Sequence, residues 1–284
     1  MTAARLPLKD QLFTREKVEL IASEIKHVDS AFKADEFVTA VVAQFPLLEL
    51  KARIAWIATC LKRRLPRDFR EAASVLVRSL PAPADPALSD ADFGDFIYAP
   101  YAEYVAQQGC TAEDLEFSLA TLREITTRFS AEFAIRPFLD AFPGEVLATL
   151  LVWTEDRHYH VRRLCSEGTR PRLPWARNLT LPNDVGIPVL DRLFADPTRY
   201  VTRSVANHVN DISKKNPDLA LDTLERWRNS GLQQPREMHY VIRHGARTLR
   251  RADHPRALDL VRSPFAGALH EKEKKQGLDV VRDK

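Results

Sequence analysis

Glycine is scarce in this sequence, with 9 residues among 284. The alternation of β-branched and polar residues that indicates half-buried strands is also rare. The 18 prolines mostly lie between segments of apolar periodicity, where proline can begin or end a helix without breaking it. Together these observations argue against sheets and predict an all-α fold.

Cysteine and long apolar runs are scarce as well. Cys60, Cys110 and Cys165 are odd in number and widely spaced, so they indicate reduced thiols and neither a disulfide framework nor a zinc site. No run of about 18 apolar residues is present that could span a bilayer. Residues 1–22 lack the apolar core of a signal peptide. We therefore expect a cytoplasmic protein with no membrane partner.

Charge is distributed unevenly along the chain. Residues 1–151 contain 17 basic and 22 acidic side chains, whereas residues 152–262 contain 20 basic and 13 acidic ones. Of those 20 basic residues, 18 are arginine, which binds phosphate through two parallel hydrogen bonds. Nucleic acid is the partner that this pattern favours. The alternative is that the arginines cover apolar neighbours with their aliphatic stems.

The stretch from Thr154 to Arg177 concentrates this charge. Six arginines occur between Arg157 and Arg177, together with one acid, Glu167. A surface that only bound phosphate would be weakened by a carboxylate, so Glu167 needs a reason of its own. The alternative to a functional role is an ion pair with Arg163, one helical turn earlier.

The amino-terminal half of the chain reads as successive helices with apolar residues at three- and four-residue spacing. Thr111 is the expected N-cap of the last of them, and Gly109 is expected to end the helix before it. The Pro-rich segment of residues 81–90 is interpreted as a long interhelical loop. The predicted helices are Arg15–His27, Ala34–Ala43, Leu47–Arg64, Arg67–Leu80, Asp92–Gln107 and Thr111–Phe129.

An internal repeat begins near residue 145. The segments 160–163 (HVRR), 200–203 (YVTR) and 240–243 (YVIR) recur at intervals of 40 residues, each with valine two places before arginine and each preceded by an apolar helix. A period near 40 built from two helices is typical of HEAT-like solenoids. We therefore predict one α-solenoid over residues 1–262 with a concave basic groove. Residues 1–110 would supply amino-terminal helices, residues 111–262 the repeats, and residues 263–284 a charged tail.

The repeat also predicts which residues share a face, because residues four apart lie one above another on a helix. The polar rows would line the groove, while the valines would face neighbouring helices. The predicted rows are Arg163 with Glu167; Arg203 with Asn207 and Asp211; and Arg243 with Arg247 and Arg251.

Three segments of the sequence resemble the helical-repeat DNA alkylation repair glycosylases of the AlkC group. They are Arg123–Leu139 (REITTRFSAEFAIRPFL), Val161–Ala176 (VRRLCSEGTRPRLPWA) and Tyr200–Leu219 (YVTRSVANHVNDISKKNPDL). The resemblance extends over most of residues 110–262. Some members have an additional carboxy-terminal β-sandwich, which we expect to be absent here because the chain ends soon after Arg262 with a charged tail.

The resemblance implies a DNA glycosylase of base excision repair that releases cationic alkylated bases, chiefly 3-methyladenine and also 3-methylcytosine. Its implied partner is double-stranded DNA containing such bases, and we expect a monomer that associates with the nucleoid when bound to DNA. A non-catalytic HEAT-like module that binds DNA or an acidic protein is the alternative. No cofactor is expected, and the spacing of His158, His160 and His208 fits no familiar metal site.

The resemblance also implies site residues, which are assigned here by their positions in this sequence. The candidate catalytic carboxylates are Asp211, Glu167 and Glu132; the alternatives are a surface ion pair for Asp211 and a helix-start acid for Glu132. The ring of Trp175 would contact the lesion, attracted by the positive charge of the alkylated base. The alternative is that Trp175 packs as a loop residue. The residues expected to bind the DNA backbone are Arg163, Arg170, Arg203, Arg243 and Arg247.

Overall fold

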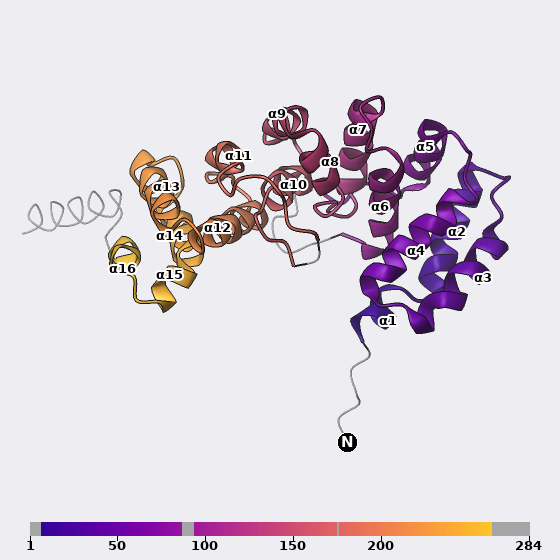
Figure 1. Ribbon diagram of the computed structural model, residues 1–284, viewed down its shortest axis with the longest axis horizontal. Helices are drawn as coiled ribbons and strands as arrows, with labels where there is room; N and C mark the ends of the chain where they lie inside the picture. Colours follow the sequence, from indigo (N-terminus) through magenta and orange to yellow (C-terminus); the bar gives the residue numbers. More distant parts are fainter. Residues whose placement is uncertain (1–6, 87–93, 175, 263–284) are drawn as a thin grey trace, which may run out of the picture. The chain divides into compact units, whose positions relative to one another are not determined.

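Helices joined by turns and loops make up the computed structural model, which describes residues 7–86, 94–174 and 176–262 (Figure 1). Within these ranges no strand forms, and extended backbone pairs only in an isolated bridge between Gly94 and Phe129. The all-α prediction is confirmed. No helix in the described ranges is long and apolar enough to cross a membrane.

The chain divides into two compact units. The first extends to Thr149 and also includes Pro174–Arg177, while the second contains Leu150–Leu173 and the residues from Asn178 onward. The predicted change from amino-terminal helices to repeats lies at residue 110, earlier in the chain than the division between these units. Unit 1 therefore includes a short segment that is distant from it in sequence.

Unit 1 is built from helices whose apolar faces form its core. Thr14 caps one of them by accepting a hydrogen bond from the Lys17 amide at 3.3 Å, and Asp68 caps another through the Glu71 amide at 2.8 Å. The elements are α1 (Leu8–Leu12), α2 (Arg15–Val28), α3 (Ala34–Gln44), η1 (Phe45–Leu47), α4 (Leu50–Lys62), α5 (Phe69–Ser79), η2 (Phe96–Tyr98), α6 (Ala99–Gln108), α7 (Leu115–Thr126) and α8 (Arg136–Ala141).

Helix starts are where the sequence prediction fails in this unit. The helix expected from Leu47 begins at Leu50, because residues 45–47 form a 3-10 turn first. The N-cap predicted at Thr111 is wrong: α7 begins at Leu115, and the Thr111 hydroxyl accepts a hydrogen bond from the Asp114 amide at 3.2 Å. Gly109 ends α6 as predicted. The loop expected over residues 81–90 lies partly outside the described residues. So does the start of the helix expected from Asp92, and in the described part that prediction is wrong, because Gly94 forms a bridge, Phe96–Tyr98 form a 3-10 turn and α6 begins only at Ala99.

The bridge at Gly94 joins the chain before η2 to the chain after α7. Gly94 has a φ of +74°, and a Cβ atom there would lie 1.7 Å from the carbonyl oxygen of Arg128. The Asp95 amide donates to that same oxygen at 3.0 Å. Only glycine fits this position, because both the left-handed conformation and the close approach exclude a side chain.

Unit 2 continues the chain as helix pairs. Helix α9 (Pro143–Trp153) spans the division between the units and precedes α10 (Tyr159–Gly168). The remaining helices are α11 (Ile187–Leu193), α12 (Arg199–Ser213), α13 (Pro217–Ser230), α14 (Pro235–Gly245), α15 (Arg247–Arg251) and α16 (Pro255–Arg262). Within the unit α10 packs on α12, and α12 packs on α14. The three recurring segments thus lie on consecutive stacked helices, and the helical-repeat prediction is confirmed.

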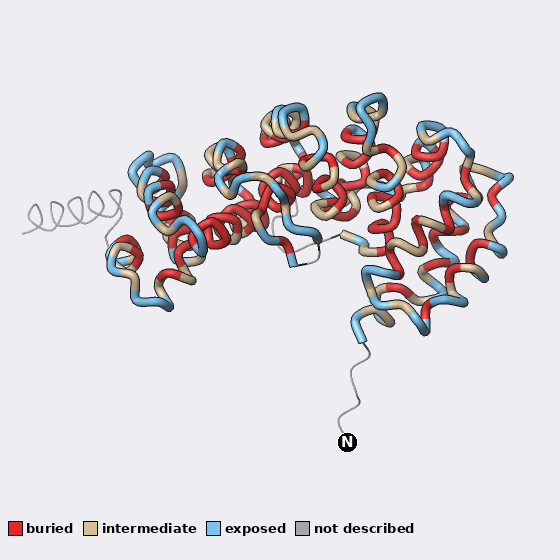
Figure 2. The backbone as a smooth tube through the Cα atoms, in the orientation of Figure 1, coloured by how far each residue is buried: buried red, intermediate tan, exposed pale blue. Residues whose placement is uncertain are grey.

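The valines of the repeat face neighbouring helices as predicted. Val161, Val201 and Val241 are fully buried, one on each of the three stacked helices. Helix α12 lies between the other two and is buried along most of its length (Figure 2). Arg199 at its start binds Glu237 of α14, with 2.8 Å from Nε to each carboxylate oxygen. Polar side chains on α12 must therefore find partners inside the protein.

We predict that Gly94→Ala lowers the free energy of unfolding by about 2 kcal/mol or more, because alanine must adopt a left-handed conformation against a carbonyl oxygen. Gly144→Ala is the matched control, since nothing lies within 4 Å of the Cβ atom it would add. Urea unfolding measures both variants. Equal stability of the two would contradict the role given to Gly94.

Candidate functional site

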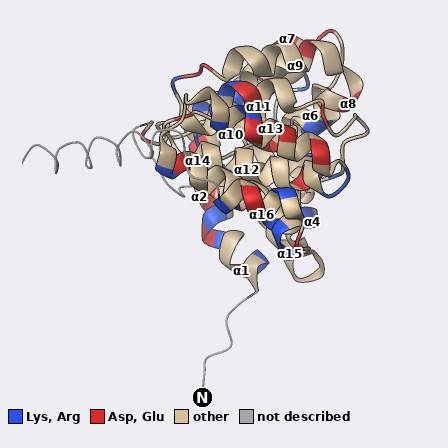
Figure 3. Ribbon diagram, turned by 90° about the vertical axis from the view of Figure 1, so that its left-hand side faces the viewer, with Lys and Arg blue, Asp and Glu red and all other residues tan. Residues whose placement is uncertain are grey.

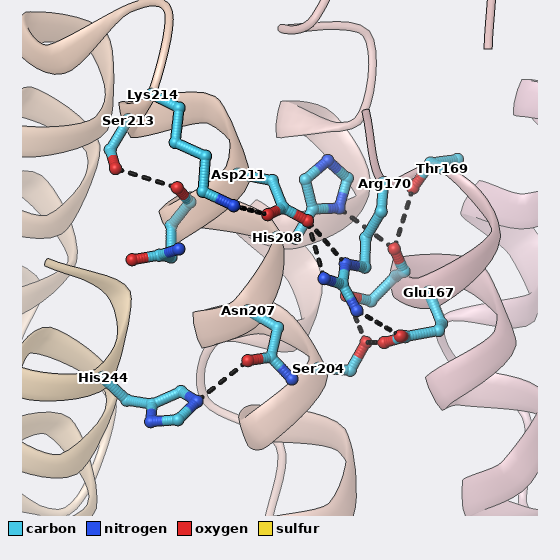
Figure 4. Close-up of polar contacts among 12 residues, drawn as sticks. Glu167, Thr169, Arg170, Ser204, Asn207, His208, Asp211, Ser213, Lys214 and His244 are labelled. Atoms are coloured by element: carbon cyan, nitrogen blue, oxygen red, sulfur yellow. Dashed lines mark hydrogen bonds and ion pairs between the residues drawn. The ribbon is translucent and has the colours of Figure 1, made fainter. Parts of the chain in front are cut away.

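Arg170 holds two carboxylates together in unit 2 (Figure 4). Its side chain follows the end of α10 and lies against α12, where Nε and Nη2 donate to Oδ2 of Asp211 at 2.9 and 2.7 Å. Nη1 donates to Oε1 of Glu167. All three residues are buried, with exposed fractions of 8% for Arg170, 4% for Asp211 and 5% for Glu167. One guanidinium therefore neutralises carboxylates from two successive repeats.

Glu167 has further partners that keep it ionised. Ser204 of α12 donates to Oε2 at 2.5 Å, and Nη2 of Arg163 lies 3.7 Å from Oε1. Burial alone raises the pKa of this carboxyl, but the charges of Arg163 and Arg170 and the hydrogen bonds from Ser204 and Arg170 hold it below its ordinary value. Glu167 is therefore a carboxylate at neutral pH.

Asp211 is as deeply buried as Glu167, but it also lines a cavity. Its other oxygen, Oδ1, accepts a hydrogen bond from Lys214 at 2.8 Å. The residue lines a cavity of about 510 Å³ in unit 2, and Arg172, Lys214 and Lys215 line the same cavity. The Asp211 carboxylate thus lies at the edge of a cavity that is also lined by three cations.

His208 fills the space beside the Arg170 cluster. Its Nδ1 lies 3.0 Å from the carbonyl oxygen of Ser166, so the ring donates from this nitrogen. Nε2 is buried and has no hydrogen-bond partner among the described residues. Burial, followed by the charge of Arg170, lowers the pKa of His208 to about 4. A Cβ atom at Gly186 would lie 2.4 Å from the ring, so glycine there makes room for the histidine.

The buried polar face of α12 is not the row that four-residue spacing predicted. A helix turns about 100° per residue, so Asp211 lies only about 20° around the axis from Ser204, seven residues earlier, but about 80° from Arg203. Ser204, His208 and Asp211 therefore share one face. Sequence reasoning overlooked Ser204 as a partner of Glu167, although the seven-residue spacing from Asp211 was a usable signal. The ion pair considered for Asp211 is present, with Lys214 as its partner.

Two arginines expected to bind the DNA backbone are placed otherwise. Arg163 and Arg170 are both buried and face Glu167 or Asp211. The guanidinium of Arg163 also lies 4.6 Å from the centre of the Tyr200 ring. Both side chains point inward, because a buried carboxylate stays ionised only if a cation or hydrogen-bond donors lie beside it. The ion pair between Arg163 and Glu167 that was considered from the sequence is present, within a larger cluster.

Arg203, Arg243 and Arg247 lie nearer the surface. Arg243 is exposed, whereas Arg203 and Arg247 are half-buried. The predicted row of Arg243, Arg247 and Arg251 does not lie on one helix, because α14 ends at Gly245 and Arg247 begins α15 (Figure 3). Nη1 of Arg247 donates to the carbonyl oxygen of His244 at 2.7 Å, and this bond links the two helices.

Glu132 and Trp175 are the two remaining predicted site residues, and the structure describes only Glu132. Glu132 lies in unit 1, in the turn before α8, which begins only at Arg136. It is therefore not an acid of the first helical turn, as the alternative proposed, and it lines a cavity of that unit. Trp175 lies outside the described residues. No group of three His, Cys, Asp or Glu side chains in the described part of the chain is arranged to hold a metal ion.

Comparison with known proteins places this arrangement in a family. The chain is similar to a solved structure from Pseudomonas fluorescens, the alkylpurine DNA glycosylase AlkC bound to DNA containing an abasic site analog. The TM-score is 0.78 and the identity 34%, over 90% of this chain and 68% of that one. The chain belongs to the AlkC family.

The chain is also similar to a second protein. The uncharacterized protein YhaZ of Bacillus subtilis (strain 168) is 36% identical over 249 residues, which is 85% of this chain. The chain spans 65% of the length of YhaZ. No family model matches the sequence.

We predict that Arg170→Met lowers the free energy of unfolding by about 3 kcal/mol, because it leaves two buried carboxylates short of a cation. Arg256→Met is the matched control in the same unit. Arg256 also binds several acids, among them Asp218 at 3.0 Å and Asp222 at 2.6 Å, but at an exposed surface, where ion pairs contribute about 1 kcal/mol or less. Urea unfolding compares the two. Equal losses of unfolding free energy would show that the Arg170 cluster stabilises the fold no more than a surface network of ion pairs does.

We predict a second effect, on pH dependence. Between pH 6.5 and about 4 the unfolded chain protonates His208 while the folded protein does not, so stability falls as pH decreases through this range, by roughly 3 kcal/mol. His208→Asn should reduce that loss. It should not abolish the loss, because burial and then Arg247 also lower the pKa of His244 to about 4. Unfolding midpoints across the range test this, with exposed His27→Asn as the control. An unchanged pH profile in His208→Asn would contradict the prediction.

Proposed function

We propose that this protein is a DNA glycosylase that hydrolyses the N-glycosidic bond of cationic alkylated bases, chiefly 3-methyladenine and also 3-methylcytosine, in base excision repair. The similarity to a Pseudomonas alkylpurine DNA glycosylase supports the class of reaction. The observation that carries the proposal is the Asp211 carboxylate, which borders a cavity lined by Arg172, Lys214 and Lys215. A surface that only bound DNA would gain nothing from that negative charge.

The chemistry suits a carboxylate without a general acid. A purine methylated on N3 is already a cation, so it leaves the sugar as a neutral molecule and needs no proton. The remaining tasks are to stabilise the positive charge that develops on the sugar and to position the water that adds to C1′. We assign both tasks to Asp211. The bond between C1′ and the base breaks, water oxygen bonds to C1′, and one proton of that water passes to solvent.

Glu167 and the buried arginines would act through Asp211. Arg170 fixes the position of the Asp211 carboxylate, and Glu167 in turn fixes Arg170 and offsets part of its charge. Without Glu167 the guanidinium would neutralise Asp211 more completely and weaken its attraction for a sugar cation. We therefore propose Arg170 and Glu167 as positioning residues. A group held this way needs no rearrangement when the charge develops.

DNA binding is proposed for the cations nearer the surface. Residues 152–262 have an excess of seven positive charges. Arg203, Arg243 and Arg247, together with the lysines beside Asp211, are candidates for contacts with phosphates. Arg163 and Arg170 are not candidates for phosphate contacts, because both are buried and form ion pairs with carboxylates. Affinity for DNA should fall steeply as salt rises, because each phosphate contact releases a bound counterion. The lesion contact assigned to Trp175 remains part of the proposal.

We predict that Asp211→Asn slows release of 3-methyladenine by about 100-fold or more, the loss typical of removing one preorganised electrostatic group. DNA affinity should be equal or tighter, since a negative charge near phosphates is removed. Single-turnover release from methylated duplex measures the first effect, and binding to duplex with an uncleavable abasic analogue measures the second. Thermal unfolding under assay conditions confirms that the variant is folded.

Asp218→Asn is the matched control. Asp218 lies on α13 in the same unit and is exposed, where it binds Arg256, so its loss should leave release unchanged. Undiminished release by Asp211→Asn would remove Asp211 from the mechanism. No release by the unmodified protein from any methylated DNA would instead favour the non-catalytic binding module.

A further inference from the structure

His244 links α14 to α12 through its side chain. Its Nε2 lies 2.8 Å from Oδ1 of Asn207, and the pair lies beside the Arg170 cluster (Figure 4). Because the amide oxygen is an acceptor, Nε2 carries the proton of the neutral ring and Nδ1 is left as an acceptor. Nδ1 has no hydrogen-bond partner among the described residues. Both residues are half-buried, so the ring is partly open to solvent.

Packing fixes the orientation of this ring. Tyr240, one turn earlier on α14, stacks against it with ring centroids 5.4 Å apart and planes at 10°. The guanidinium of Arg199 in turn lies 3.8 Å from the centre of the Tyr240 ring, and Glu237 binds Arg199. His244 is therefore held in place before any ligand arrives, so a ligand does not have to order it.

The charged groups that act on His244 are all cations. Burial, followed by the charges of Arg247 of α15, Arg203 of α12 and Arg170, lowers the pKa of His244 to about 4. Helices α13 and α16 also pack on α14, but among the described residues no charge on either helix shifts this pKa. The free protein therefore combines three positive charges with a neutral imidazole at this place.

Arg247 has no acid beside it. Its Nη1 donates to the carbonyl oxygen of His244 at 2.7 Å, and among the described residues no carboxylate forms an ion pair with it. Arg170 and Arg199 of the same unit each bind a carboxylate. Burial lowers the pKa of Arg247, and the more distant charge of Asp211 offsets this only in part. A half-buried cation among other cations attracts an anion.

We propose that His244 and Arg247 together bind one backbone phosphate of the DNA, and that His244 takes up a proton from solvent when this phosphate arrives. The inference rests on the DNA partner of the proposed function. Nε2 of His244 keeps its hydrogen bond to Asn207, while the added proton on Nδ1 makes that nitrogen a donor to a phosphate oxygen. Arg247 donates to the same phosphate from its guanidinium. No covalent bond other than the new N–H bond forms or breaks.

The phosphate removes a reason why the free ring is neutral. Its negative charge offsets the arginines around His244, so the pKa of His244 rises on DNA. A group that binds its proton only in the complex makes the complex tighter as pH falls. A return of this pKa from about 4 to the ordinary value of about 6.5 increases DNA affinity about tenfold between pH 8 and about pH 5.5.

The experiment measures binding of the full-length protein to a duplex with an uncleavable abasic analogue across this pH range at constant ionic strength. Affinity should rise about tenfold as pH falls. Calorimetry in buffers of different ionisation enthalpy should show about one proton taken up per complex near pH 5.5. His244→Gln, which cannot be protonated, should abolish both effects. His27→Asn, at an exposed histidine of unit 1, is the control and should retain them.

An NMR titration of the His244 ring in the unmodified protein gives a second readout that does not depend on a variant. The ring should titrate near pH 4 in the free protein and near its ordinary value of about 6.5 on DNA. Equal titration in both states, or a pH effect that His244→Gln retains, would overturn the inference. Proton uptake with inorganic phosphate alone would overturn it as well, because the site would then serve a free anion and not DNA.

These measurements are independent of the proposed reaction, because the abasic analogue has no base to release. Proton uptake on DNA by a protein that releases no base from methylated DNA would support this inference and overturn the proposed glycosylase. Base release without proton uptake on DNA would overturn this inference and leave the proposed function standing.

Discussion

The arrangement of unit 2 depends on one guanidinium that faces two buried carboxylates. An acid removed from water becomes protonated unless a cation or several hydrogen bonds hold its charge. Arg170 supplies the cation for both Glu167 and Asp211, and Arg163, Ser204 and Lys214 supply the rest. Such clusters contribute little net stability, because desolvation offsets the attraction. Their effect is to keep a negative charge fixed at the edge of a basic cavity.

The sequence predicts the helices and their stacking because both follow from local patterns. The valines that recur every 40 residues are buried on α10, α12 and α14, as periodicity predicts. The partners of the carboxylates do not follow from such patterns. Arg170 lies beyond the end of α10, where helical spacing no longer applies, and it meets Asp211 across 41 residues of sequence. The rows of four-residue spacing also drift around the helix, so Asp211 belongs with Ser204 and not with Arg203.

The cavity of unit 1 was beyond prediction for a related reason. Its lining comes from the start of α4, from η2 and α6, from the turn before α8 and from the segment at Ala176. Two of these segments carry the family resemblance, but neither indicates by itself that a cavity forms there. Glu132 was selected through resemblance, but its neighbours Phe96 and Glu103 were not, because only the folded chain brings them together. The bridge at Gly94 that brings the segment before η2 against the end of α7 rests on a single glycine with no helical context.

The segment Pro174–Arg177 belongs to unit 1 although its flanking residues belong to unit 2. Nε of Arg136, a fully buried residue, donates to the carbonyl oxygen of Arg177 at 2.6 Å, and Arg177 binds Asp140 on the same helix. A fragment that ends at Thr149 would lack that carbonyl and part of the cavity wall. During synthesis, too, unit 1 is incomplete until residue 177 has left the ribosome, when the first helix of unit 2 has already emerged.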